Sequence, residues 1–391
     1  MHPRKPRLPF ANVCFFPAAA LHAALLLPWS VLTMLGLVPV LPGLATPAGH
    51  AHEMLFGYAL AVVAGYLLGP QPLRFTLTLL ACWLLARIGF LLWPDSWLAV
   101  GANLLFAAGL VWKVVPRFVG AAKKWRNQAV APVVIGLGLA SSVAGLDSGP
   151  APQLREQALL LFAVLLFFMG GRIIAPALAG HAQSEGRKLE ARVQPQIEGA
   201  VLILLGLALG LSLLPWALLE RVTGGLLVAA GVLSAIRLLR WQPWHCRQRP
   251  DLLVLLLGYA WLTVGLLLFG VALSGPWLPL SATLHALAVG ALGSLSFGVM
   301  ARTRLLFRFR DANARAWIHP CALLLSAAAL ARVLPALLGH THPLWLLLAA
   351  ACWSSAFLAL AVLLWQTRDS HPHSARHSMT DHDAGTPGRH A

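Results

Sequence analysis

Residues 252–273 read LLVLLLGYAWLTVGLLLFGVAL, an apolar stretch without a charged side chain that lies between Asp251 and Ser274. A helix of about 20 such residues spans the hydrocarbon core of a bilayer, which is roughly 30 Å thick. Backbone N–H and C=O groups find no water in that core, so a continuous helix is the form that satisfies them. The stretch therefore predicts a transmembrane helix, and a lipid bilayer as the surroundings of the chain.

The composition of the whole chain excludes a soluble protein. Of the 391 residues, 59% are hydrophobic and 11% are charged, whereas soluble domains carry about 25% charged residues. The formal net charge of +16 does not indicate a nucleic-acid binder, because the Lys and Arg residues lie between long apolar runs and not on one polar element. We expect no nucleic-acid partner.

The apolar pattern recurs along the chain and predicts an all-α membrane protein of about 12 transmembrane helices. Clusters of Pro and Gly separate the apolar runs, as at residues 69–72 and 149–152. The predicted helices span residues 15–40, 51–69, 73–93, 97–115, 129–147, 156–179, 196–214, 216–238, 251–273, 281–302, 317–339 and 343–366.

The distribution of positive charge predicts that both termini are cytoplasmic. With the N-terminus inside, 24 of the 29 Lys and Arg residues fall in cytoplasmic segments, two fall outside and three lie within helices, as the positive-inside rule requires. The expected organisation in a bacterial inner membrane is a cytoplasmic N-terminus (1–14), a polytopic domain (15–368) and a disordered, His-rich cytoplasmic tail (369–391).

Ionisable side chains within the predicted helices are candidate functional residues, because charge at membrane depth is costly. Most of them lie in the predicted outer half of the membrane, and this similar depth predicts one shared site. They are His50, His52, Glu53, Arg87, His285, Arg332, His340 and His342.

The spacing of the histidines bears on metal binding. His50 and His52 follow a Pro-Ala-Gly segment, which predicts an extended chain in which residues two apart share a side. The same holds for His340 and His342. Imidazole is a common ligand of copper, haem iron and zinc, so these four and His285 are candidate metal ligands. Solvated loop histidines are the alternative, favoured for His340 and His342.

Small residues follow two of the histidines along their helices. Gly57 and Gly65 lie beneath His52, and Gly290 lies beneath His285. Small residues let helices pack closely, and they also leave room for a flat macrocycle on an axial histidine. Both interpretations are open.

The charges within the helices predict two pairings. Glu53 faces Arg87 and Arg332 at similar depth, and Arg172 pairs with Glu198 at the inner end. Three arginines then share two carboxylates, so either a bound anion such as a haem propionate or structural pairing alone accounts for the surplus.

With these residues in view, the chain resembles the NnrS family, bacterial membrane proteins described as containing haem and copper and associated with nitric-oxide stress. The matching strings are HAHEMLFGY (50–58), GGRIIAP (170–176), GYAWL (258–262), and HALAVGALG (285–293), which runs on to VMAR (299–302). The chain departs from the family pattern at Gly49, at residues 69–72, at Leu256 and at residues 306–310, where the family carries possible ligands at the last two.

The resemblance implies a haem-binding, and more weakly a copper-binding, membrane protein linked to nitric-oxide stress or denitrification. It implies axial or metal ligands at His52 and His285, anion partners at Arg87 and Arg332, and an orienting carboxylate at Glu53. No residue is assigned to catalysis. A transporter or permease without a redox cofactor is the alternative, although its expected midplane charges and matching broken helices do not occur in the predicted topology.

The predicted orientation leads to a first test. Reporter fusions after Arg126 and after Ser148 are expected to lie in the cytoplasm and the periplasm respectively, because five positive charges precede the first point and the next predicted helix separates the two points. Alkaline phosphatase activity measures the periplasmic location of each fusion. Two fusions on the same side of the membrane would contradict the topology.

Overall fold

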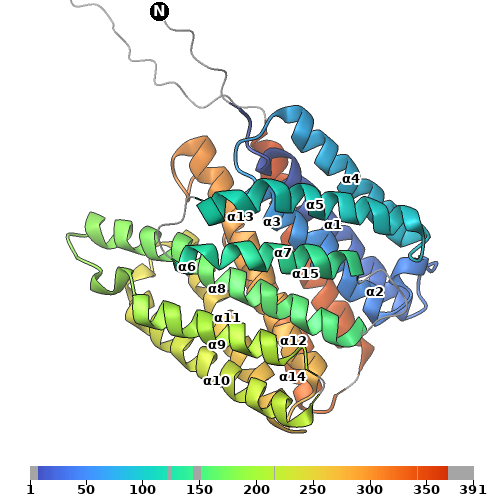
Figure 1. Cartoon of the computed structure of the whole chain (residues 1–391). Helices are drawn as coiled ribbons and strands as arrows, with labels where there is room; N and C mark the ends of the chain where they lie inside the picture. Colours follow the sequence, from blue (N-terminus) through green and yellow to red (C-terminus); the bar gives the residue numbers. More distant parts are fainter. Residues whose placement is uncertain (1–7, 121–124, 144–150, 215, 341, 369–391) are drawn as a thin grey trace, which may run out of the picture.

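The fold, seen in a computed structural model that describes residues 8–120, 125–143, 151–214, 216–340 and 342–368, is a bundle of long helices (Figure 1). Within these ranges every regular element is helical, which confirms the predicted all-α class. Ten helices in the described ranges have the length and apolarity to cross a membrane, so the chain is a multi-pass membrane protein. They are α1 (Asn12–Met34), α4 (Leu73–Leu92), α5 (Trp97–Gly120), α8 (Ala151–Ser184), α9 (Pro195–Leu211), α10 (Ala217–Arg240), α11 (Pro250–Ser274), the continuous helix α12 (Leu280–His285)–η5 (Ala286–Gly293)–α13 (Ser294–Phe309), α14 (Cys321–Leu337) and α15 (Pro343–Gln366).

Two further predicted helices correspond to segments outside this set of ten. The first is the continuous helix α2 (Pro47–His52)–η2 (Glu53–Ala59)–α3 (Leu60–Leu67), in which three ionisable residues lower the apolarity of the opening turns. The second is α7 (Val130–Val143), whose described length is 14 residues. The count of twelve and the orientation of the termini stay predictions. The predicted tail, 369–391, lies outside the described residues.

Short elements connect these helices and cap their ends. They are η1 (Pro42–Leu44), α6 (Trp125–Gln128), η3 (Glu190–Arg192), η4 (Pro243–Cys246) and η6 (Ala316–Ile318).

The most buried helices form the centre of the bundle. In their most apolar stretches, 78% of the residues are buried in α8 and in the α12–η5–α13 helix, against 33% in α9 and 39% in α4. Helix α11 packs against α8, α10, η5 and α13, while α1 packs against α3 and α15. Helix α3 is buried at every residue except Tyr66, and 56% of the most apolar stretch of α1 is buried.

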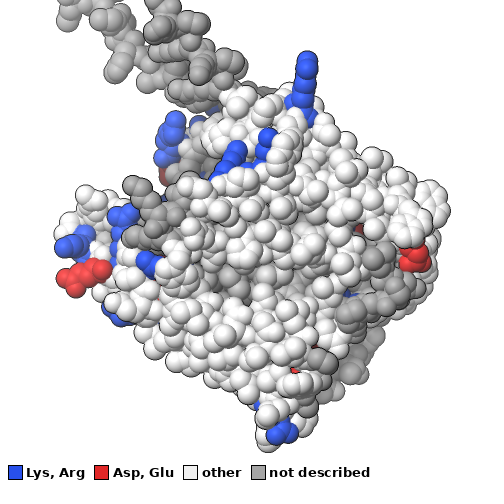
Figure 2. Space-filling view, in the orientation of Figure 1, with Lys and Arg blue, Asp and Glu red and all other residues white. Residues whose placement is uncertain are grey.

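One end of the bundle is rich in arginine. There Arg117 of α5 donates to the Leu68 carbonyl oxygen, and Arg302 of α13 pairs with Asp251 at the start of α11. Figure 2 shows blue Lys and Arg side chains gathered at the upper left and left of the molecule, beside a broad white surface of uncharged residues. We call this the arginine-rich end; it is the end that the charge pattern predicts to be cytoplasmic.

Candidate functional site

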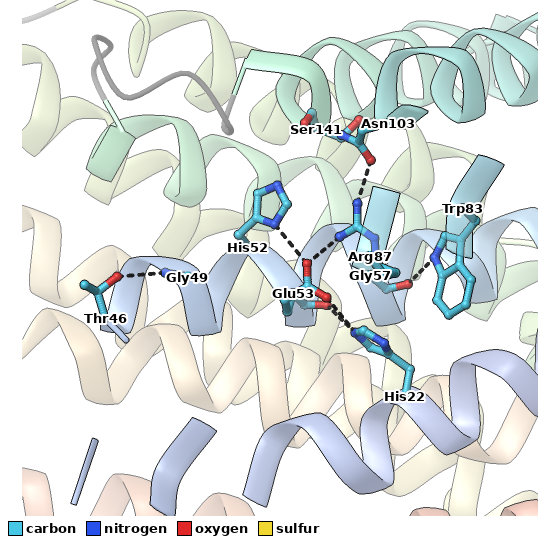
Figure 3. Close-up of polar contacts among 10 residues, drawn as sticks. All are labelled: His22, Thr46, Gly49, His52, Glu53, Gly57, Trp83, Arg87, Asn103 and Ser141. Carbon is cyan, nitrogen blue, oxygen red and sulfur yellow. Dashed lines mark hydrogen bonds and ion pairs between the residues drawn. The ribbon is translucent and has the colours of Figure 1, made fainter. Parts of the chain in front are cut away.

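A buried carboxylate organises the opposite end of the bundle (Figure 3). The side chain of Glu53 has no exposed surface, and its Oε1 accepts a hydrogen bond of 2.7 Å from Arg87 Nη1. Oε1 also lies 3.3 Å from Nδ1 of His52. Oε2 lies 3.2 Å from Nε2 of His22, an ion-pair contact without hydrogen-bond alignment. We call these residues the Glu53 network.

The network extends beyond Glu53 through the second edge of the guanidinium. Arg87 Nη2 donates to Asn103 Oδ1 over 2.7 Å, and the Asn103 amide donates to the Ser141 carbonyl oxygen. The contacts join α1, α2, η2, α4, α5 and α7. Breaking a buried ion pair by removing one partner costs about 3–5 kcal/mol, so the network holds these six elements in one arrangement.

Sequence reasoning missed His22. This residue lies in the apolar helix α1 and is 7% exposed. A lone ionisable residue in an apolar helix is itself a signal, but the partner, 31 residues further along the chain, could not be inferred. Gly57 makes the contact possible, because a Cβ there would lie 2.4 Å from His22 Nε2.

Neighbouring aromatic rings fill the space beside the other glycines that follow the histidines. A Cβ on Gly65 would lie 2.6 Å from Phe16, one on Gly290 the same distance from Trp261, and one on Gly293 the same distance from Trp353. These positions are helix-packing contacts. The open groove for a macrocycle that the sequence left possible does not occur at them.

The structure divides the predicted residues into two groups, and the first consists of His52, Glu53 and Arg87. Thr46 Oγ1 accepts from the Gly49 N–H over 3.1 Å and Pro47 occupies the first turn, so α2 begins before the histidines. His50 and His52 are therefore helical, and residues two apart on a helix point to different sides. The extended segment predicted from the Pro-Ala-Gly spacing was wrong. The single shared site stays a prediction, and its residues fall into two sets of contacts.

The second group consists of His50, His285 and Arg332. His50 Nδ1 lies 3.1 Å from the Ser30 hydroxyl, and His285 Nδ1 donates to the Ser281 carbonyl oxygen over 2.6 Å. Arg332 lies within electrostatic range of both imidazoles and His50 within range of His285, so positive charges on these groups would repel one another. Arg332 thus belongs with these histidines and not with Glu53, where the sequence placed it.

A π-helical segment follows His52, and another follows His285. The segment Glu53–Ala59 begins directly after His52, and Ala286–Gly293 begins directly after His285. In the first segment, Trp83 Nε1 donates to the Gly57 carbonyl oxygen over 2.9 Å. Wider π-helical turns are rare and occur frequently at functional sites.

The strings that suggested the family meet in space. Tyr58 of HAHEMLFGY shares a short hydrogen bond with Ser296, just beyond HALAVGALG. Gly170 of GGRIIAP leaves room for the Tyr259 ring of GYAWL, which a Cβ would approach to 3.2 Å. The family model described as NnrS protein matches residues 10–367. The chain belongs to the NnrS family. A search of curated proteins found no match.

The loop histidines of this NnrS-family chain lie apart from both groups. His340 and His342 are exposed, and His342 Nδ1 accepts from the Leu344 N–H over 3.3 Å at the start of α15. Among the described residues, no hydrogen bond or ion pair joins either one to the other predicted ligands. Nor do these residues contain any group of three or more His, Cys, Asp or Glu arranged to hold a metal ion.

The predicted pair of Arg172 and Glu198 was wrong. Glu198 pairs with Arg237 and Arg126, each over 2.5 Å, while the Arg172 guanidinium lies 5.0 Å from the ring centre of Phe168. Gly171 explains why Arg237 and not Arg172 pairs with Glu198, because its missing Cβ leaves room for the Arg237 guanidinium.

The His22–Glu53 contact can be tested through Gly57. A Gly57→Ala substitution places a methyl group against the imidazole and is expected to cost about 1–3 kcal/mol as overpacking, which lowers the melting temperature of the detergent-purified protein. Gly101→Ala is the matched control, because nothing lies within 4 Å of a Cβ on that helical glycine. The control is expected to leave stability unchanged or raise it by up to about 1 kcal/mol. Equal melting temperatures for the two variants would contradict the assigned contact.

Proposed function

We propose that this NnrS-family protein binds haem at His285, with His50 and Arg332 beside it, and serves in nitric-oxide or denitrification-linked stress. The observation that supports the proposal most is the hydrogen bond from His285 Nδ1 to the Ser281 carbonyl oxygen. A histidine that ligates a metal usually donates its other N–H to such an oxygen, which fixes the ring and directs Nε2 to the metal.

Two features near His285 support haem binding outside the filled glycine positions Gly290 and Gly293. His285 and Arg332 are both half-buried, and the hydrogen bond of His285 uses Nδ1, which leaves Nε2 for a ligand. Among the described residues, no acidic side chain forms an ion pair with Arg332, and its guanidinium is free to bind a propionate in the bidentate manner that arginine favours. Haem iron held by one histidine supplies an open position for a small diatomic molecule such as nitric oxide.

The surroundings of His52 do not suit a haem group. The His52 ring stacks on Phe90 with centroids 3.7 Å apart, and its Nδ1 faces Glu53. The cavity beside it, lined also by Arg87 and Asn103, has a volume of about 10 Å³, which is room for about one water molecule. In this proposal His52, Glu53 and Arg87 position α2, and through it His50, and they do not bind haem.

Copper is a second candidate ligand of the same group. His50 and His285 interact with each other, and both engage Nδ1 in a hydrogen bond, which leaves Nε2 of each available. Imidazole nitrogen suits copper as well as haem iron. Two imidazoles provide fewer ligands than a closed copper site requires, so haem is the first proposal.

The proposal is tested by the absorbance of protein purified from haem-replete cells. Wild type is expected to show a Soret band, and His285→Ala is expected to lose or shift it because the axial nitrogen is gone. Arg332→Gln is expected to weaken haem retention by about tenfold, as the loss of about 1.4 kcal/mol of anion binding would do. Copper analysis of the same samples separates the two candidate ligands.

The controls for this experiment are His340→Ala, an exposed loop histidine, and His52→Gln, which lies in the Glu53 network. Both variants are expected to keep the Soret band, because neither removes the axial nitrogen of His285 and the Gln side chain keeps a hydrogen-bonding group toward Glu53. A colourless wild-type protein would favour the transporter hypothesis. A Soret band that is lost in His52→Gln and kept in His285→Ala would show that haem binds in the Glu53 network, and this result would contradict the proposal.

A further inference from the structure

A large cavity opens at the arginine-rich end, away from both histidine groups. Its volume is about 920 Å³, and arginines from four elements line it together with one acidic residue. The charged lining residues are Arg126 of α6, Arg172 of α8, Arg192 of η3, Arg237 of α10 and Glu198 of α9.

The cavity wall carries more positive than negative charge. Four guanidinium groups and one carboxylate leave a net charge of +3. Glu198 is engaged by Arg126 and Arg237, whereas within the described ranges no acid forms an ion pair with Arg172 or Arg192. Guanidinium groups bind phosphate and carboxylate in a bidentate manner and are chosen over lysine where such anions are recognised. The wall is therefore complementary to an anion.

The cationic wall is built into the packed interior. Arg237 is 2% exposed, and its guanidinium lies over the rings of Phe167 and Trp241 at 4.7 Å and 4.9 Å. Nε of Arg237 is buried without a hydrogen-bond partner, and a Cβ on Gly171 would clash with this guanidinium at 2.2 Å. Arg237 is therefore a fixed part of the cavity wall, held by Glu198 and the two aromatic rings.

An apolar groove continues from the cavity into the membrane-embedded part of the bundle. Tyr66, Leu67 and Met169 line both. The groove runs between α3, α8, α11 and the α12–η5–α13 helix, and nearly all of its lining surface is apolar. Among the described residues, no histidine lines the cavity or the groove. A ligand that occupies both must have an anionic head and an apolar chain, and needs no axial ligand.

We propose that this cavity binds an acidic phospholipid, with the phosphate among Arg126, Arg172 and Arg192 and the first few methylene groups of one acyl chain in the apolar groove, whose volume is about 70 Å³. The predicted orientation places the cavity at the cytoplasmic leaflet, where basic pockets between transmembrane helices bind acidic headgroups. A soluble phosphate compound shares the headgroup chemistry but would leave the groove unused. The proposal is independent of haem binding, since it uses none of the histidines.

Native mass spectrometry of the delipidated full-length protein tests this assignment. The probes are phosphatidylglycerol, phosphatidylcholine and glycerol 3-phosphate. Wild type is expected to bind phosphatidylglycerol about tenfold more tightly than phosphatidylcholine, which corresponds to about 1.4 kcal/mol. The double variant Arg172→Gln/Arg192→Gln is expected to reduce that preference to about twofold or less, because each lost guanidinium removes a phosphate contact.

Arg221→Gln is the matched control, since Arg221 is an exposed arginine in the first turns of α10, away from the cavity. It is expected to keep the tenfold preference. Leu166→Trp, which fills the groove, is expected to weaken phosphatidylglycerol more than glycerol 3-phosphate. Equal binding of the two lipids to wild type, or a preference that survives in the double variant, would overturn the proposal. Glycerol 3-phosphate binding as tightly as phosphatidylglycerol would assign the cavity to soluble anions and also overturn it.

Discussion

The carboxylate of Glu53 has no exposed surface and lies where a membrane protein cannot leave a charge unpaired. Arg87 supplies the opposite charge, and His52 and His22 complete the surroundings. Because these partners come from different helices, satisfying one carboxylate fixes α1, η2 and α4 relative to each other. The position of α2 follows, and with it the direction in which His50 points.

The two ends of the bundle solve the same electrostatic problem in related ways. At each end one glutamate is held by arginine, and a glycine removes the Cβ that would block the approach: Gly57 for His22 and Gly171 for Arg237. The difference lies in the balance of charge. The Glu53 network is compact and leaves room for about one water molecule, whereas the arginine-rich end keeps a cavity of about 920 Å³ with surplus positive charge.

Much of the fold was predictable from hydropathy, since each apolar run must form a helix in a bilayer. The sequence also identified the candidate residues, because ionisable groups in apolar helices are conspicuous. The sequence did not show which of these residues contact one another. Thr46 and Pro47 carry the local signal that separates His50 from His52, but the π-helical turns and the pairing of His22 with Glu53 depend on contacts between distant helices. The burial of Arg237 and its pairing with Glu198 likewise depend on contacts between helices that the sequence alone does not show.

We assign a structural role to the Glu53 network and ligand binding to the His285 group, and the Glu53–Arg87 ion pair is the contact on which the structural role depends. A double-mutant cycle tests this most directly, with Glu53→Gln, Arg87→Met and the double variant compared by free energy of unfolding in mixed detergent micelles. Each single variant is expected to lose about 3–5 kcal/mol because it leaves a buried charge without its partner. The double variant is expected to lose at least about 2 kcal/mol less than the sum, within the range measured for directly interacting residues. Additive losses would show that the two charges do not depend on each other and would contradict the account.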